Sequence, residues 1–387
     1  MLKIIKSTYI RDFIFLLLGL YYAQGTLYAK GTSFSKALYI IIIVISFFYF
    51  IKTLLLKNTK TLFYNIWTIL FLLNFFGFMF TGINSNPYHI SMFKGVLLTL
   101  MIFYPFYFFS YQNILKIKNL TSFLLLMIPL FILQYYLNAE QILDERVSNK
   151  LDVVNNASYL FVGLIPYVLL LKQKKIVATV IMLILIFFII QSSKRGALFS
   201  GVIGLLFFVF FQLRTIEKKN RFKSYLYLSA AIIGISYFTF NVFKNNEYLT
   251  LRLENILEGE SSGRDTIYFN LFYNWVQSDN FINLIFGFGF AASIQLSNTG
   301  NFAHNDWLEL LSNFGLFGVT IYFILFMAAL KKVMSPNWII EKRIILLVIV
   351  LIMLMNTLVY RFYSAGDGFL YSIMLAYLIG SKNKELI

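Results

Sequence analysis

The chain contains no cysteine and only two histidines among its 387 residues. The absence of cysteine excludes disulfide bonds and thiolate metal sites. His89 and His304 lie far apart in the sequence, which argues against a histidine-based metal centre and leaves only carboxylate-bound Mg²⁺ or Ca²⁺ open. We therefore expect neither a resident metal ion nor a cofactor.

Charged residues are also scarce, because they make up 13% of the chain while hydrophobic residues make up 59%. A soluble domain would carry roughly a quarter charged residues. Apolar runs of about 17–25 residues, long enough to cross a hydrocarbon core of about 30 Å, recur along the whole length. The composition predicts an all-α, polytopic membrane protein and excludes a soluble or nucleic-acid-binding role.

Twelve membrane-spanning helices are predicted within a single transmembrane domain that covers residues 1–387. The first follows the basic residues Lys3, Lys6 and Arg11 without a cleavage site, so we expect a retained span rather than a signal peptide. The last predicted span is short. The approximate ranges are 13–29, 37–56, 62–80, 95–112, 120–137, 157–171, 176–192, 197–213, 224–240, 307–330, 344–362 and 369–380.

The net charge of +16 is distributed unevenly between the connecting segments. With the N-terminus inside, the cytoplasmic segments carry 22 basic residues and the outer segments 11. Acidic residues divide the other way, with 4 inside and 13 outside, although they carry little orienting weight. The distribution predicts that both termini are cytoplasmic.

The longest connection, residues 241–306 between the ninth and tenth spans, is predicted to be a large periplasmic loop that contains short amphipathic helices. Ser261 and Ser262 form a helix-start signal, and aromatic residues follow at helical spacing, as in helices that lie along a membrane surface. Gly263 and Arg264 fall at this helix start, where backbone amides and the helix dipole favour an anion. Arg264 is therefore a candidate for binding a phosphate.

A second polar interruption, Lys194 and Arg195, lies within a run of apolar residues from 176 to 213. The predicted topology places both residues on the outer side, against the usual bias of basic residues. Charges at a membrane-embedded turn cost about 2.5–3.5 kcal/mol each on insertion scales, so they usually have a function. Gly196 is expected to let the chain turn tightly.

A third polar group precedes and enters the tenth span, in the sequence NFAHNDWLELLSNFGLFG at 301–318. Asp306 and Glu309 resemble a capping box with Asp306 as the N-cap, which places His304 and Asn305 just before the helix. His304 shares the outer face with the two arginine segments, so it is predicted to be functional. Gly315 and Gly318 would permit close helix contact.

Three further polar residues lie outside these segments. Arg361 and Arg252 are further candidate residues of the site. His89 lacks charged neighbours of the same kind and is expected to be an ordinary loop residue.

The segment HNDWLELLSNFGLFG resembles the H-[N/S/Q]-x9-G-x-x-[G/T/Y] pattern of the O-antigen ligase and O-antigen polymerase superfamily. His304 and Asn305 stand at its start, and Gly315 and Gly318 at its end. SGRDTIYFNLF at 262–272 is similar to the Gly-Arg segment in the large loop of the family. IFGFGF at 285–290 is similar to its glycine-containing segment ahead of the histidine. SSKRGA at 192–197 is similar to its earlier Arg-Gly element.

The resemblance implies a bacterial inner-membrane glycosyltransferase of the GT-C type, with its active site facing the periplasm. Its donor would be a glycan on undecaprenyl diphosphate, and its acceptor a second lipid-linked repeat unit or the lipid A core. A flippase and a chain-length regulator of the same pathway would be further partners. The predicted catalytic residues are His304, Arg264 and Arg195, and the predicted substrate-binding residues are Lys194, Asn305, Asp306, Glu309, Gly263 and Arg361.

Three functions remain open from the sequence. We favour a polymerase of O-antigen or capsule repeat units, with an O-antigen ligase as the alternative. A secondary transporter or a flippase of lipid-linked oligosaccharides also has about twelve spans. Transporters, however, place polar residues near the bilayer midplane in repeated halves, whereas here they gather at one face.

Overall fold

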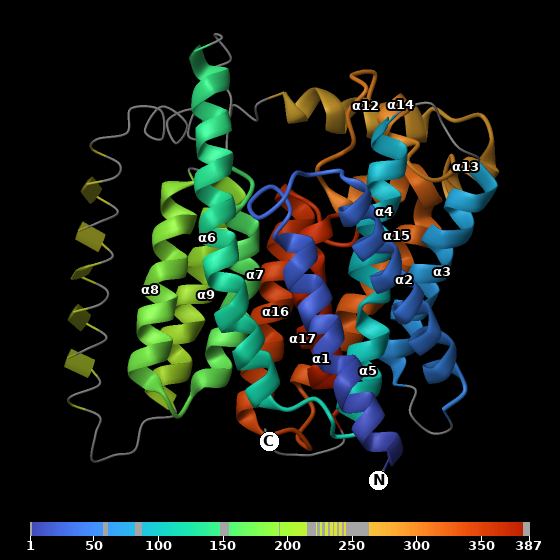
Figure 1. Cartoon of the computed structure of the whole chain (residues 1–387). Helices are drawn as coiled ribbons and strands as arrows, with labels where there is room; N and C mark the ends of the chain where they lie inside the picture. Colours follow the sequence, from blue (N-terminus) through green and yellow to red (C-terminus); the bar gives the residue numbers. More distant parts are fainter. Residues whose placement is uncertain are drawn as a thin grey trace.

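The computed structural model describes residues 2–56, 61–81, 87–147, 155–192, 194–214 and 263–381, together with isolated positions between 222 and 244. The described residues form helices and no sheet, with one isolated bridge between Gln24 and Tyr28. The helices stand roughly side by side as a bundle, and α12, α13 and α14 gather at one end (Figure 1). The predicted all-α class is confirmed for this part of the chain.

The helices before the large loop are α1 (Leu2–Tyr22), α2 (Ser33–Leu54), α3 (Leu62–Thr81), α4 (Pro87–Met101), α5 (Phe103–Tyr111), α6 (Ile117–Val147), α7 (Ser158–Val168), the 3-10 turn η1 (Leu169–Leu171), α8 (Lys175–Gln191) and α9 (Arg195–Arg214). Those in and after it are α12 (Arg264–Val276), α13 (Phe281–Phe286), α14 (Ser293–Leu296), α15 (Asp306–Val333), α16 (Ile340–Val359), the 3-10 turn η3 (Gly366–Gly368) and α17 (Phe369–Gly380).

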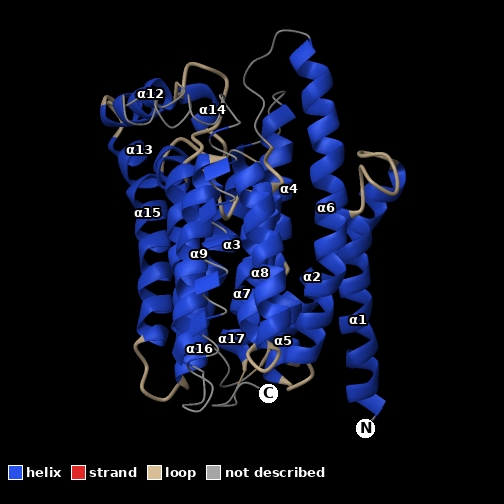
Figure 2. Ribbon diagram, turned by 90° about the vertical axis from the view of Figure 1, so that its left-hand side faces the viewer, coloured by secondary structure: helices blue, strands red, loops and turns tan. Residues whose placement is uncertain are grey.

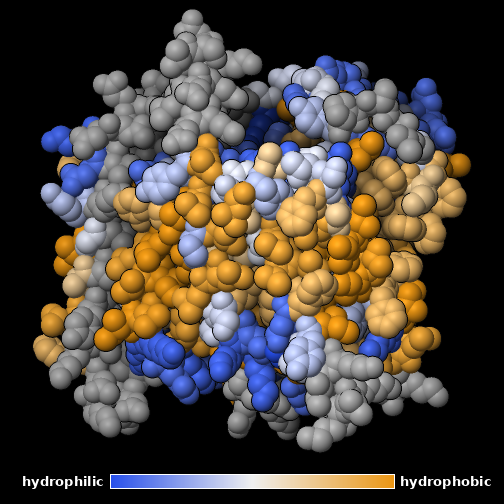
Figure 3. Space-filling view, in the orientation of Figure 1, coloured by the Kyte–Doolittle hydropathy of each residue, from blue (hydrophilic) through white to orange (hydrophobic). Residues whose placement is uncertain are grey.

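Seven of the described helical segments are long and apolar enough to cross a membrane, and they are Ser33–Leu54, Leu62–Thr81, Tyr88–Tyr111, Ile117–Asn138, Arg195–Arg214, Asp306–Val333 and Ile340–Val359. Three shorter apolar helices cover Ser158–Leu171, Lys175–Gln191 and Gly366–Gly380. Hydrophobic side chains form a broad belt around the middle of the molecule, with hydrophilic ones at both ends (Figure 3). This distribution is that of a multi-pass membrane protein.

Two of the predicted spans need comment. The first, 13–29, is wrong in its position, because α1 begins at Leu2 and ends at Tyr22. Its basic residue Arg11 is accommodated inside the bundle, where it donates hydrogen bonds to Asp12 and to the carbonyl of Ile114. The ninth predicted span, 224–240, lies outside the described residues apart from isolated helical positions.

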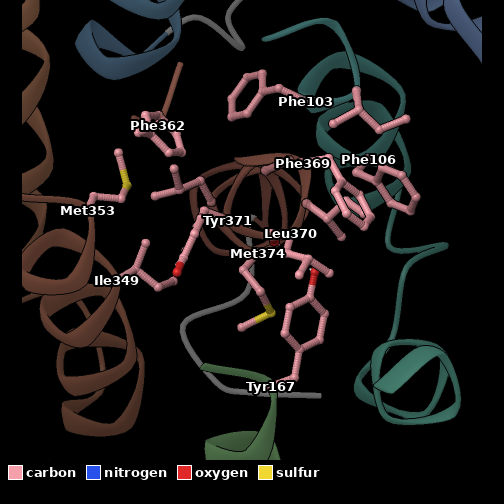
Figure 4. Close-up of a cluster of buried hydrophobic side chains, with 14 of the residues drawn as sticks. Phe103, Phe106, Tyr167, Ile349, Met353, Phe362, Phe369, Leu370, Tyr371 and Met374 are labelled. Carbon is pink, nitrogen blue, oxygen red and sulfur yellow. Dashed lines mark hydrogen bonds between the residues drawn. The ribbon is translucent and has the colours of Figure 1, made fainter. Parts of the chain in front are cut away.

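Helix α17 occupies the centre of the bundle. All of its 12 residues are buried, and side chains such as Phe103, Tyr167 and Met353 surround it (Figure 4). Tyr167 on α7 donates a hydrogen bond of 2.8 Å to the carbonyl of Leu370. A helix that is hydrophobic on all sides is typical of such a buried position, which explains why the sequence of α17 lacks a polar face.

The two ends of the bundle differ in what they carry. The start of α1 and the end of α17 lie at the end marked by the two termini in Figure 1, called here the lower face. The turn between α8 and α9, helices α12 and α14, the start of α15 and the end of α16 lie at the opposite, upper face (Figures 1 and 2). The polar segments singled out in the sequence therefore share one face.

Helix α15 is broken within the bundle at Gly315, whose φ of 60° and ψ of −156° are not helical. The break frees backbone carbonyls, and those of Ser312 and Asn313 accept hydrogen bonds from the amides of Phe288 and Gly289. Non-helical backbone at membrane depth is tolerated only where protein satisfies it in this way. Beside this loop, α3 and α15 line an apolar cavity of about 710 Å³.

Candidate functional site

Asn305 begins helix α15. Its side-chain oxygen accepts hydrogen bonds from the amides of Trp307 (2.9 Å) and Leu308 (3.2 Å), as an N-cap residue does. Its amide group donates to the carbonyl of Leu358 at the end of α16. The predicted capping box with Asp306 as the N-cap is therefore wrong, because the helix begins one residue earlier and Asp306 is already its first helical residue.

His304 is held in an unusual backbone conformation immediately before this cap. Its φ of 51° lies in the left-handed region, which costs a non-glycine residue about 1–2 kcal/mol. The imidazole is half-buried, with its ring centre 4.2 Å from that of Phe302. Its Nδ1 is buried and finds no hydrogen-bond partner among the described residues. Such local strain is typical of functional positions.

Three cations surround His304, and they come from three different segments. Arg264 is the first residue of α12, and it donates a hydrogen bond of 2.7 Å to the carbonyl of Val359 at the end of α16. Arg361 lies just beyond α16, with its guanidinium carbon 3.8 Å from the ring centre of Phe302. Lys194 precedes α9, and all three act electrostatically on His304.

Burial and these cations lower the pKa of His304 to about 3. Desolvation is the larger cause, because a half-buried imidazolium loses hydration. The positive charges of Arg264, Arg361 and Lys194 add to it by disfavouring another cation among them. The imidazole is therefore neutral at physiological pH.

Arg195 and Gly196 begin α9 at the same face. A side chain at Gly196 would collide with the hydroxyl of Tyr159 and with Val359, so this glycine serves close packing within the helix rather than the tight turn that was expected. Because Val359 also accepts the hydrogen bond of Arg264, the start of α9 and the start of α12 meet at the end of α16. This contact places Arg195 near the site.

Gly263 supplies the left-handed residue that starts α12. Its φ is 78°, a conformation that glycine adopts at little cost. It orients the first turn so that Arg264 points to α16. The expected helix-start signal at Ser261 and Ser262, like Arg252, lies outside the described residues.

Two fully buried carboxylates hold the segments of the site in place through hydrogen bonds. Asp306 accepts hydrogen bonds from the hydroxyl of Tyr322 and from the amides of Phe362 (2.8 Å) and Tyr363 (3.3 Å). Those two amides follow Arg361 directly, so Asp306 fixes the backbone on which Arg361 stands.

Glu309 holds the segment that precedes α15. It accepts a hydrogen bond of 3.0 Å from the amide of Ala303, next to His304, and others from Ser293 and Asn313. Both carboxylates were predicted to bind substrate. The structure shows both side chains buried and in contact with the protein, while Oδ1 of Asp306 has no hydrogen-bond partner among the described residues.

Sequence reasoning missed Tyr268 at this face and misjudged His89. His89 lies in α4 and is buried among Phe78 and Phe290, so the expectation of a loop residue is wrong. Tyr268 on α12 interacts with Arg264 and Asn305. Tyrosines are frequent in this chain, and no spacing signal distinguishes a site tyrosine from a packing one.

The site is rich in cations and poor in metal ligands. In the part of the chain that the structure describes, no group of three His, Asp or Glu side chains is arranged to hold a metal ion. Fixed cations beside a half-buried neutral imidazole are suited to bind an anionic group and to accept a proton next to it.

Comparison with known proteins identifies the central segment of the chain. No curated protein and no solved structure gives a significant match. The family model described as O-antigen ligase matches residues 178–323, a segment that includes Lys194, Arg195, Arg264 and His304. Residues 178–323 of this multi-pass membrane protein are therefore similar to the O-antigen ligase family, as the histidine motif indicated.

Proposed function

We propose that the protein is a membrane glycosyltransferase that polymerises oligosaccharide repeat units carried on undecaprenyl diphosphate. The observation that carries this proposal is the convergence of Lys194, Arg264 and Arg361 on His304 at one face of the bundle. These residues come from segments far apart in the sequence. Fixed cations around a neutral imidazole match the needs of glycan transfer from a lipid diphosphate.

The cations serve the leaving group. The bond between the anomeric carbon of the donor sugar and the diphosphate oxygen breaks, and negative charge develops on that oxygen. Arg264 and Arg361, with Lys194 and Arg195 beside them, stabilise this charge. Guanidinium groups suit the role because they bind two phosphate oxygens at once and stay protonated.

His304 serves the acceptor. A sugar hydroxyl of the acceptor attacks the anomeric carbon, and its proton passes to the neutral imidazole as the new glycosidic bond forms. In the unliganded protein His304 is a weak base, because its pKa is lowered to about 3. A bound diphosphate brings negative charge next to the same cations, offsets their effect and so raises the pKa of His304 towards the range of a useful base.

The site would face the periplasm of the bacterial inner membrane, with both termini in the cytoplasm. The support is the distribution of 22 basic residues on the proposed inner segments against 11 on the outer ones. A transporter or flippase is disfavoured, since the charged residues lie at the upper face rather than in a repeated arrangement at the midplane.

An O-antigen ligase that transfers the glycan to the lipid A core is the second candidate, and the description of the matched family favours it. Deletion of the gene separates the two reactions when surface polysaccharide is resolved on a gel. Lipid A core that carries a single repeat unit indicates a polymerase. Core without any repeat unit, together with accumulated lipid-linked polymer, indicates a ligase. An unchanged polysaccharide pattern would refute both.

A further inference from the structure

One half-buried carboxylate, Asp367, interacts electrostatically with Arg361. It lies in the middle of η3, between two glycines, where the chain passes from α16 to α17. Neighbouring helices fix this turn, because the hydroxyl of Thr99 donates to the carbonyl of Ala365 and that of Tyr22 donates to the carbonyl of Gly366. The carboxylate is thus presented on rigid backbone.

The side chain of Asp367 accepts no hydrogen bond from another described side chain. Among the described residues, only its own backbone amide donates a hydrogen bond to it, no neighbouring side chain does, and it interacts electrostatically with Arg361. Arg361 acts on His304 as well. It therefore links the carboxylate to the site, and its own buried Nε finds no hydrogen-bond partner within the described ranges.

Tyr159 on α7 carries a second polar group without a partner. The side chain is 1% exposed, yet its hydroxyl makes no hydrogen bond to any described residue. Its ring stacks on that of Tyr360, with the ring centres 3.8 Å apart and an angle of 5° between the ring planes. Tyr159 also interacts electrostatically with Arg264 and Asp367. A buried hydroxyl left unsatisfied costs about 1–3 kcal/mol, so its retention points to a ligand.

The two groups complement each other chemically. The phenol of Tyr159 can donate a hydrogen bond, and the carboxylate of Asp367 can only accept. They interact electrostatically but do not hydrogen-bond to each other. A sugar hydroxyl, which accepts and donates at once, can bridge such a pair.

The sign of the charge assigns the pair to one of the two substrates. A carboxylate repels the diphosphate of the donor, which the cations attract. The acceptor presents neutral sugar hydroxyl groups at the reaction centre, away from its own lipid diphosphate, and these groups suffer no such repulsion. The space-filling view also shows hydrophilic atoms in a recess of the upper face (Figure 3), the face at which α16 ends (Figure 1).

We propose that Asp367 and the hydroxyl of Tyr159 form a subsite for hydroxyl groups of the acceptor sugar. The inference rests on the proposed glycan transfer and deepens it, because it assigns acceptor recognition to residues outside the segment 178–323. The cations hold the donor, while Asp367 and Tyr159 orient the acceptor towards His304.

Transfer by the purified full-length protein tests this assignment. The donor is the lipid-linked repeat unit extracted from cells that lack the gene, and the acceptor is the water-soluble oligosaccharide released from that lipid by mild acid. For Asp367→Ala, Asp367→Asn and Tyr159→Phe we expect the acceptor KM to rise about tenfold or more, with the donor KM within about twofold of wild type. Donor cleavage by water should continue.

Two matched variants control for structural damage. Tyr167→Phe also removes one buried hydroxyl, but one that has a partner in the carbonyl of Leu370, and Asp12→Asn removes a carboxylate paired with Arg11. Tyr159→Phe should melt at the same temperature as wild type or higher, because it deletes an unsatisfied polar group. Tyr167→Phe should melt lower and leave the acceptor KM unchanged.

The outcomes separate the inference from the proposed function. An acceptor KM that stays at the wild-type value in the Asp367 and Tyr159 variants overturns the subsite, as does an equal rise of the donor and acceptor KM. If the wild type neither transfers nor cleaves the donor, the proposed function fails. The thermal shift that the soluble oligosaccharide causes then decides the subsite: it persists in both variants if the subsite is wrong and disappears if it is right.

Discussion

Replacement of His304 gives the most discriminating test of the proposed mechanism. Three variants differ in what they retain. His304→Ala removes the base, His304→Gln keeps polarity without a titratable nitrogen, and His304→Arg adds a fourth cation next to Arg264, Arg361 and Lys194. If the imidazole accepts the proton of the acceptor hydroxyl, all three variants lose this general base.

The expected loss follows from the role. General-base assistance typically contributes about 10²–10⁴-fold, so kcat should fall by that factor in the Ala and Gln variants. His304→Gly provides a control for folding. Because the φ of this residue is 51°, glycine relieves a strain of about 1–2 kcal/mol, so this variant should be inactive and yet melt at a higher temperature than His304→Ala.

The pH dependence provides an independent measurement. The pKa of His304 is lowered to about 3, so the free protein keeps a neutral imidazole at every pH above that value. The kcat/KM for the donor, which reports the free protein, should therefore not fall through protonation of His304 between pH 7 and 5. Arg361→Met removes one of the cations that lower this pKa, and the loss of activity on acidification should move to higher pH.

The assay is transfer from purified lipid-linked donor, with insertion of each variant checked by its yield from the membrane. Substantial activity in His304→Arg would refute the base and make His304 part of the phosphate clamp. A rise of wild-type kcat/KM from pH 7 to pH 5 would point the same way, since a clamp gains charge on acidification.

Three further predictions concern the cations, the break in α15 and the orientation. Arg264→Lys keeps the charge but loses the two-pronged fork and the hydrogen bond to α16, so transfer should fall at least about tenfold with normal protein levels; full activity would remove it from the site. Gly315→Ala should lower the yield of folded protein severely, because its φ is 60° and a Cβ would lie 2.5 Å from the backbone of Ile285; a normal melting temperature would contradict this. In the cysteine-free chain, Asn301→Cys should react with an impermeant thiol reagent in intact spheroplasts, whereas Asn337→Cys, exposed at the other end of α15, should react only after permeabilisation; the reverse pattern would invert the proposed topology.

The sequence alone determined the class of the protein and the positions of most helices. A hydrocarbon core of about 30 Å forces each crossing into an apolar helix of about 20 residues, so hydrophobic runs report helices directly. Each predicted span in the described part of the chain overlaps a helix. The first was misplaced because Arg11 finds internal partners, which a count of charges cannot foresee.

The sequence also determined the local motif around His304, because spacing within one segment needs no knowledge of the rest of the fold. It did not decide what that motif contacts. Only packing of α9, α12 and the end of α16 brings Lys194, Arg264 and Arg361 together. Such contacts depend on long-range arrangement, and a single sequence carries no signal for them.

The tertiary structure likewise decided the roles of polar residues that look alike in the sequence. Asp306 and Glu309 were predicted from the sequence to bind substrate, and the structure adds that each is buried and accepts hydrogen bonds from nearby backbone amides. Asp367 and Tyr159 gave no signal, because an acid between glycines and one tyrosine among 26 are unremarkable as letters. In the described part of the folded chain, no neighbouring side chain forms a hydrogen bond with these two groups. Only the folded arrangement of the helices determines which polar groups remain free for a substrate.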